Sequence, residues 1–170
     1  MRTPALLAVL LAGVLMACSG TDMTTLSESD QAFLRSVQDQ AVQAPESILS
    51  NEEVDPAVKD LVKEVQRSGD QLAVQGKHLI GDVSQTVEDN PSAKALIDQA
   101  QEAIDKSDAK AQARAWIQAA IHQREALIKA AQVQIDTGTN PEVIKLAENV
   151  KKEQGALIQE LRTRLEQLSK

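Results

Sequence analysis

The chain has 170 residues and carries 18 Lys and Arg against 25 Asp and Glu, which gives a net charge of −7. An acidic surface repels phosphates, so the composition argues against a nucleic-acid-binding protein and against electrostatic adhesion to anionic lipids. With one Cys, one Trp, one Phe and no Tyr, the chain has no internal disulfide, and aliphatic side chains must form the core, as in closely packed helices.

An apolar leader ends at the only cysteine of the chain. Arg2 precedes an apolar run over residues 5–15, and the leader closes with Leu15-Met16-Ala17-Cys18. A run of this length is too short to span a bilayer and is typical of a secretory signal peptide. The spacing before Cys18 resembles the bacterial lipobox, which implies that residues 1–17 are removed and that Cys18 is acylated, for example with palmitate. The alternative is a plain signal peptide with a chance cysteine.

Residues 19–26 are small and polar, and we interpret them, with Cys18, as a tether (18–26) ahead of a helical domain at 27–170. A helix then begins at a cap on Ser27 or Ser29. Its apolar residues recur with helical spacing at Phe33, Val37, Ala41, Ala44 and Ile48. Pro45 removes a backbone amide, which predicts a kink or a shortened helix there.

The pair Asp55-Pro56 predicts the start of a second helix, with Asp as the N-cap and Pro at the first helical position. Its apolar seam consists of Val58, Val62, Val65, Gly69, Leu72, Gly76 and Leu79. The two glycines lie on the packing face, so we expect a close helix approach or a local irregularity there. The segment ends at Gly81, which completes a first hairpin over residues 27–80.

Residues 81–107 form a connector, in which Asn90-Pro91 predicts a short helix. One side of that helix carries Ala93, Leu96, Ile97, Ala100 and Ile104. Either Ser107 or Asp108 caps a new helix, or the chain bends within one long helix over residues 91–136; the pattern leaves both open.

The last part of the chain, residues 108–168, predicts a second hairpin without any strand. Its first helix runs from Ala109 to about Asp136, with Ile117, Ile121, Leu127, Ile128, Ala131 and Ile135 inward. Gly138 follows its end, and Asn140-Pro141 starts the last helix. The seam of that helix consists of Val143, Ala147, Val150, Gln154, Leu157, Leu161 and Leu168.

The two proline starts align at an offset of 85 residues, so that Leu61, Val65 and Leu72 fall on Leu146, Val150 and Leu157. Even the break in the seam coincides, Gly69 against Gln154. A chance match between two amphipathic helices is the alternative explanation. Two hairpins that each expose an apolar stripe bury it against one another, which predicts an all-α four-helix bundle with an extra short connector helix.

A spaced pattern follows His122. Its members are His122-Gln123, Ala126-Leu127, Lys129-Ala130, Gly138, Pro141-Glu142-Val143, Leu146-Ala147, and Gln154 with Leu157-Ile158. The pattern is similar to the ferritin-like family filed as domain of unknown function 305, and residues 30–72 resemble it more faintly. The resemblance implies an exported helical bundle and, in some members, a copper-related role through histidines and methionines.

The chemical positions of that family are mostly replaced. Gln123, Lys129 and Leu157 stand where the family pattern has His, Met and Glu. Copper(I) requires several soft ligands on one ion, and His78 and His122 are the only histidines. A lone His on a helix is more often a surface or packing residue, so copper binding is the alternative function.

The remaining candidates for chemistry are few. Neither histidine has a Glu three residues before it, which argues against a di-iron centre, and carboxylates such as Glu28 and Asp30 suit helix starts. Most of the many glutamines are expected on solvated faces. Trp116 is expected to fill the core, with a partner contact as the alternative. We therefore expect no enzyme but a lipid-anchored binding or scaffolding module of the bacterial cell envelope. It would lie on the periplasmic face of the outer membrane or on the outer face of the cytoplasmic membrane, and contact a protein partner there.

Overall fold

The computed structural model describes residues 26–40, 46–80 and 108–170. Within these ranges the chain forms five helices and no strand. The helices are α1 (Glu28–Gln38), α2 (Glu46–Ser50), α3 (Pro56–Ile80), α5 (Ala109–Thr137) and α6 (Pro141–Gln167). The all-α prediction is confirmed for this part of the chain. The predictions for Cys18, for most of the tether and for the connector 81–107 lie outside the described residues.

The long helices begin at polar caps that the sequence predicts. The Ser27 side chain accepts a hydrogen bond from the backbone N–H of Asp30, and the Asp30 carboxylate accepts one from the backbone N–H of Ser27. The side chains of Asp55, Asp108 and Asn140 accept backbone N–H groups at the starts of α3, α5 and α6. These contacts satisfy amides that have no partner within a helix. The structure therefore selects Ser27 and Asp108 from the alternatives at their respective starts.

The first arm consists of two short helices, because α1 ends at Gln38 and α2 begins only at Glu46. Of its predicted apolar stripe, Phe33, Val37 and Ile48 are buried, while the two alanines lie outside the described residues. Pro45 also lies outside the described residues, so the kink or shortening expected there stays a prediction.

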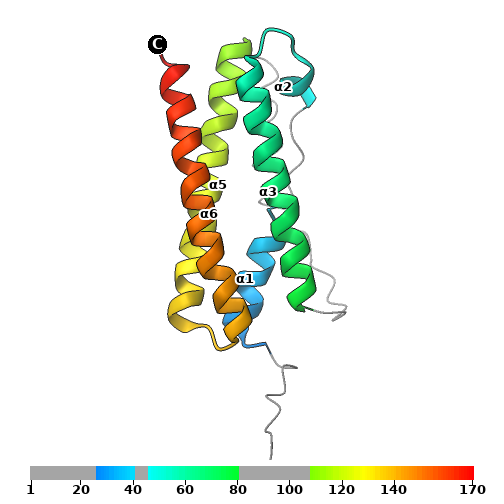
Figure 1. The fold of residues 1–170 in the computed structure, drawn as a ribbon, viewed down its shortest axis with the longest axis vertical. Coiled ribbons are helices and arrows are strands. Elements are labelled where there is room, and N and C mark those ends of the chain that lie inside the picture. The colour runs from blue at the N-terminus through cyan, green and yellow to red at the C-terminus, as the bar shows by residue number, and fades with distance from the viewer. Residues whose placement is uncertain (1–25, 41–45, 81–107) are drawn as a thin grey trace, which may run out of the picture.

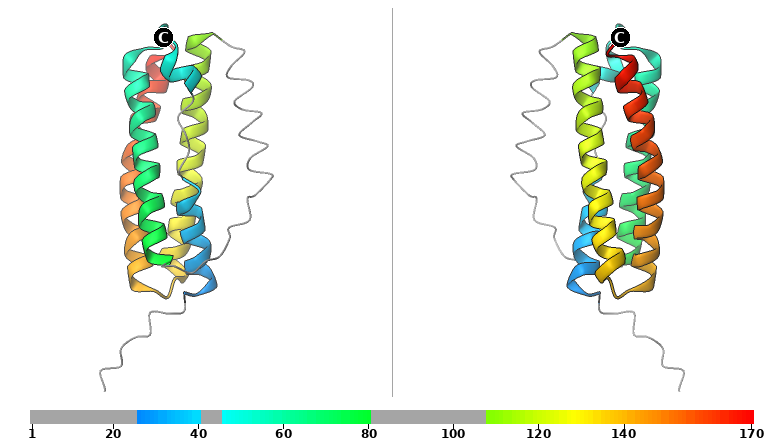
Figure 2. Two further views of the ribbon diagram at one scale, coloured as in Figure 1. Left: turned by 90° about the vertical axis from the view of Figure 1, so that its right-hand side faces the viewer. Right: turned by 90° about the vertical axis from the view of Figure 1, so that its left-hand side faces the viewer.

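Helices α1, α3, α5 and α6 lie roughly along one direction and form a helical bundle (Figure 1). The antiparallel pair α5 and α6 packs most extensively, α1 packs against α3 and α5, and α3 makes far fewer contacts with α6. The start of α1 and the turn between α5 and α6 lie at one end of the bundle, and α2 lies at the other (Figure 2). We call these the turn end and the α2 end. With 25 residues, α3 is about 37 Å long.

The apolar core divides into two clusters along the bundle axis. The α2-end cluster is centred on Ile48, Val58, Val62, Trp116, Ile117, Leu157 and Leu161. The turn-end cluster is centred on Phe33, Leu34, Val37, Leu72, Leu127, Val143 and Val150. The predicted seams of α3 and α6 are thus buried, except that Leu79 and Leu168 are half-buried. Every helix in the described ranges is too short or too polar to cross a membrane.

Candidate functional site

A layer of polar side chains crosses the bundle between the two apolar clusters, and Arg124 of α5 is its centre. Arg124 is fully buried. Its Nη1 donates to Gln40 Oε1 at 3.2 Å and its Nη2 donates to the carbonyl oxygen of Val65 at 2.9 Å, while Nε has no hydrogen-bond partner. Burial lowers the pKa of Arg124 to about 10, because the low-dielectric interior disfavours the charged form. Among the described residues, no carboxylate forms an ion pair with it.

The other members of this layer come from α3 and α6. A Cβ at Gly69 would overlap the backbone carbonyl of Gln40, so the glycine lets the chain just after α1 approach α3. Gln154 is 1% exposed; its Nε2 donates to Ser68 Oγ at 3.0 Å, and its Oε1 has no partner. The seam positions that break the apolar pattern, Gly69 and Gln154, therefore both belong to the polar layer.

A second buried polar cluster lies at the turn end, around Asp30. Its carboxylate accepts from Ser27 Oγ at 2.6 Å, from Thr139 Oγ1 at 2.8 Å and from Gln134 Nε2. The backbone N–H groups of Thr139 and Asn140 lie at 3.3 Å from Oδ1, where α6 begins. Burial raises the pKa of Asp30, but the hydrogen bonds from Ser27, Gln134 and Thr139 outweigh it and hold that pKa well below the usual range. Asp30 therefore fastens the start of α1 to the α5–α6 turn.

The seam between α3 and α6 is open and forms a groove on the surface. Two adjoining depressions of about 450 and 600 Å³ share Glu64, Glu160 and Thr163. Together they are lined by Ala57, Asp60, Leu61, Glu64, Ser68, Gln71, Glu153, Ala156, Leu157, Gln159, Glu160, Thr163, Arg164 and Gln167. We call this the acidic groove.

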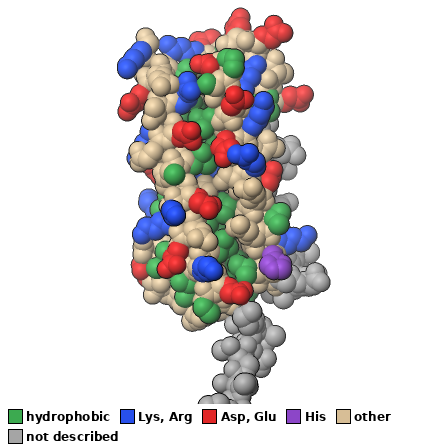
Figure 3. Space-filling model, in the orientation of Figure 1, with side chains coloured by type: hydrophobic (Ala, Val, Ile, Leu, Met, Phe, Trp, Pro, Cys, Tyr) green, Lys and Arg blue, Asp and Glu red, His purple; other side chains and the backbone are tan. Residues whose placement is uncertain are grey.

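Charge distinguishes the acidic groove from the mixed surface around it. Four of its five charged lining residues are acidic, and Arg164 is the one basic member. Arg164 lies 3.8 Å from Asp55 Oδ2, and Asp60 and Glu64 pair with Lys63 and Arg67 on the same helix. The face that contains the groove has apolar side chains along its middle and charged side chains on both sides (Figure 3). Leu61 and Leu157 lie at the floor and are 8% and 7% exposed.

The structure does not bring the two histidines together. His78 on α3 is exposed, and the side chain of His122 on α5 is 83% exposed, with Nδ1 at 3.8 Å from Glu125 Oε2. In the part of the chain that the structure describes, no group of three or more His, Cys, Asp or Glu is arranged to hold a metal ion.

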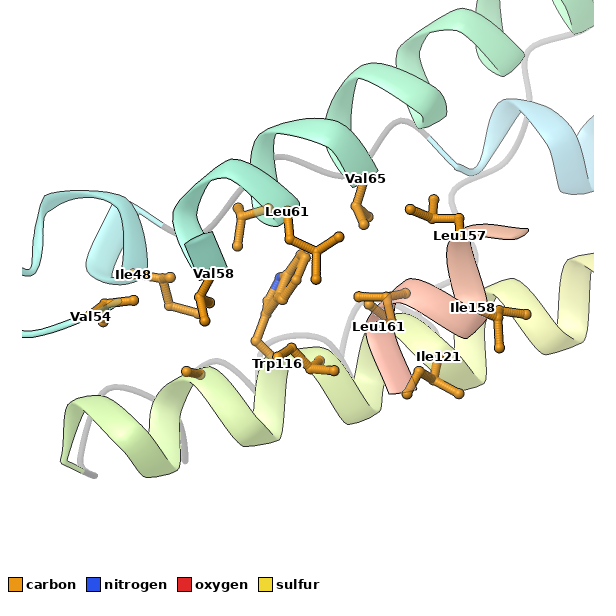
Figure 4. Close-up of a cluster of buried hydrophobic side chains, with 14 of the residues drawn as sticks. Ile48, Val54, Val58, Leu61, Val65, Trp116, Ile121, Leu157, Ile158 and Leu161 are labelled. Carbon is orange, nitrogen blue, oxygen red and sulfur yellow. The ribbon is translucent and has the colours of Figure 1, made fainter. Parts of the chain in front are cut away.

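Trp116 belongs to the α2-end cluster, where it packs from α5 toward Val58 and Leu61 of α3 (Figure 4). It is 9% exposed, which matches the position expected of a packing residue.

The sequence reasoning missed Arg124 and Gln134 and understated Asp30. The expectation that glutamines are mostly solvated fails at Gln112, Gln134 and Gln154, which are buried. A signal for Arg124 exists in hindsight, because it lies three residues from both Ile121 and Leu127 on the inward stripe. Asp30 lies at a helix start, as expected. Its hydrogen bonds to the distant residues Gln134 and Thr139 cannot be predicted from the local sequence pattern.

Comparison with protein-family models, curated proteins and solved structures finds no match to this chain.

Proposed function

We propose that the protein is a lipid-anchored helical bundle of the cell envelope that binds a protein partner and catalyses no reaction. The observation that carries this is the contrast between the interior and the α3–α6 seam. The buried polar groups, Asp30 and Arg124, are engaged in holding helices together, whereas the acidic groove is open at the surface. A groove between helices is a common binding surface.

Lipid on Cys18 provides the attachment in this proposal. Each buried methylene contributes roughly 0.8 kcal/mol, so two or three acyl chains hold an acidic protein that has no electrostatic affinity for anionic lipids. Eight residues, 19–26, separate Cys18 from the cap Ser27, and they reach at most about 28 Å. Because Ser27 lies at the turn end, this end faces the membrane and the α2 end points away from it.

The finer architecture that we propose is the ferritin-like four-helix bundle. Its support is that α1 and α2 both contact α3 and α5, so the two short helices together take one of four positions. Copper binding remains the weaker proposal, since it depends on the partial family resemblance and on exposed histidines.

Purification of the tagged full chain from detergent-extracted membranes tests the function. We expect a complex of discrete mass that contains one stoichiometric protein partner, and release of a Cys18→Ser variant into the soluble fraction. The proposal is overturned if the chain purifies alone after mild cross-linking. Stoichiometric binding of Cu(I) or Cu(II) at submicromolar concentration, lost in His122→Ala, would then favour the copper alternative.

A further inference from the structure

The acidic groove has the length and the shape that suit a helix. Its α3 wall extends from Ala57 to Gln71, which is 15 residues or about 21 Å of helix. The walls are two helices of opposite direction, and a third helix packs readily into the furrow between such a pair. The small side chains Ala57 and Ala156 leave room beside Leu61 and Leu157.

The charge of the groove restricts its occupant. Asp60, Glu64, Glu153 and Glu160 line it, and Arg164 is the one lining cation. Asp60 and Glu64 pair with Lys63 and Arg67, which lie outside the groove, but such exposed pairs are weak, and Glu153 and Glu160 are in none of the ion pairs of the described residues. The lining keeps an excess of negative charge, so a basic segment is complementary and an acidic one is repelled. The connector 81–107 of the chain has six Asp or Glu and two Lys, and a second copy presents the same net charge of −7. Neither complements the groove, which leaves a basic segment of a different protein.

The middle of the groove offers an additional hydrogen-bond acceptor. Ser68 lines the groove, and its Oγ accepts a hydrogen bond from Nε2 of the buried Gln154. The hydroxyl oxygen has a second lone pair, which an incoming N–H group can use. Lys and Arg supply such donors, in agreement with the charge of the walls.

We propose that the acidic groove binds an amphipathic helix of a partner protein that has a narrow apolar face flanked by Lys or Arg. The apolar face lies on Leu61 and Leu157, and the basic side chains lie against the carboxylates of α3 and α6. One basic side chain at the centre donates to Ser68 Oγ. This inference rests on the proposed binding role and specifies the surface and the class of partner.

A synthetic helix tests the assignment on the full chain. The probe is a labelled 15-residue peptide with Leu on one face and Lys on both flanks, and the comparison peptides replace Lys by Glu or scramble the same composition. We expect one-to-one binding of the amphipathic Lys peptide, and binding at least tenfold weaker for both comparison peptides. Added NaCl should also weaken binding, because the partners carry opposite charges.

Paired variants distinguish the groove from general attraction to an acidic protein. Glu64→Gln with Glu160→Gln should weaken binding at least tenfold, whereas Glu148→Gln with Glu166→Gln, which removes equal charge from exposed positions outside the groove, should change it less than twofold. Circular dichroism confirms that both variants are folded. Equal loss in the two pairs, or no binding of the peptide, overturns the assignment.

Accessibility of the groove tests the competing occupants. In a Cys18→Ser background, maleimide should label Gln71→Cys in the groove as fast as Lys63→Cys outside it. Slow labelling at position 71 means that the connector 81–107 or a second copy covers the groove, and this contradicts the proposal. If a partner is recovered from membranes but the peptide does not bind, only the assignment of the groove is refuted. If no partner is recovered, the binding role itself is refuted.

Discussion

Two ionisable side chains, Asp30 and Arg124, are fully buried, and the protein compensates for their burial to different degrees. Asp30 accepts several hydrogen bonds and lies at the start of α6, where the helix dipole favours negative charge. Arg124 has two partners, neither of them charged, and a free Nε. Asp30 therefore stabilises the fold. The hydrogen bonds of Arg124 do little more than offset the cost of burying its charge.

Asp30→Asn should lower the free energy of unfolding by about 2–3 kcal/mol at pH 7, because hydrogen bonds to a charged group are lost or reversed. The folded-state pKa of Asp30 is below that of the unfolded chain, near 3.9. Its contribution is therefore complete above that value and declines as the pH falls below it. Urea denaturation at pH 7 and pH 2.5 should show the difference between parent and variant shrinking. The control Glu28→Gln should cost less than about 1 kcal/mol, and a difference that is unchanged at pH 2.5 would refute the role.

Arg124→Met should change the free energy of unfolding by no more than about 1 kcal/mol. Gln40 Oε1 and the Val65 carbonyl lose a donor, but removal of the buried charge offsets that loss, and an apolar side chain of similar length fills the space. Arg124→Ala should lower the free energy of unfolding by about 2–5 kcal/mol, because it leaves a cavity. Urea denaturation of the two variants gives the comparison. If Arg124→Met lowers the free energy of unfolding as much as Arg124→Ala, the guanidinium stabilises the fold through its hydrogen bonds as well as by filling space.

At the scale of the helices, contact between elements depends on residues without side chains. The first arm approaches α3 at Gly69, where the carbonyl of Gln40 occupies the space of a Cβ. Gly155 in α6 is different, since a Cβ there would meet no atom within 4 Å. The first glycine is needed for packing, and the second costs helix stability without a steric reason.

Gly69→Ala should therefore lower the free energy of unfolding by about 1–3 kcal/mol through overpacking, whereas Gly155→Ala should raise it by about 0.5–1 kcal/mol through helix propensity. Thermal and urea denaturation of both variants measure this. A destabilising Gly155→Ala would show that the open space beside α6 is filled in the folded protein.

The helix starts and the apolar seams could be predicted from the sequence because they are local features. Asp55-Pro56 and Asn140-Pro141 combine a cap with a pre-organised first residue, and a seam repeats with the helical period. The buried polar groups could not be predicted in the same way. The contact between Asp30 and Gln134 joins residues 104 positions apart, and that between Arg124 and Gln40 joins residues 84 apart. The acidic groove depends on how closely α3 packs against α6, which the periodicity of either helix alone does not fix.

In our proposal, the whole molecule combines a membrane attachment at one end with a binding surface along its side. In our account the turn end faces the membrane, and the acidic groove extends along α3 and α6 toward the α2 end. This placement presents the groove sideways to other envelope proteins, so binding and anchoring do not compete for one surface.

Site-specific photo-cross-linking of the membrane-anchored full chain tests the central claim, that the bundle binds a protein partner, most directly. A photoreactive residue replaces Gln71 or Gln159 in the groove, or Gln118 or Lys129 on α5, all of which are exposed. We predict a discrete adduct with a single partner protein from the groove positions and none from α5. If no position on either face gives an adduct with another protein, the bundle is not a binding module.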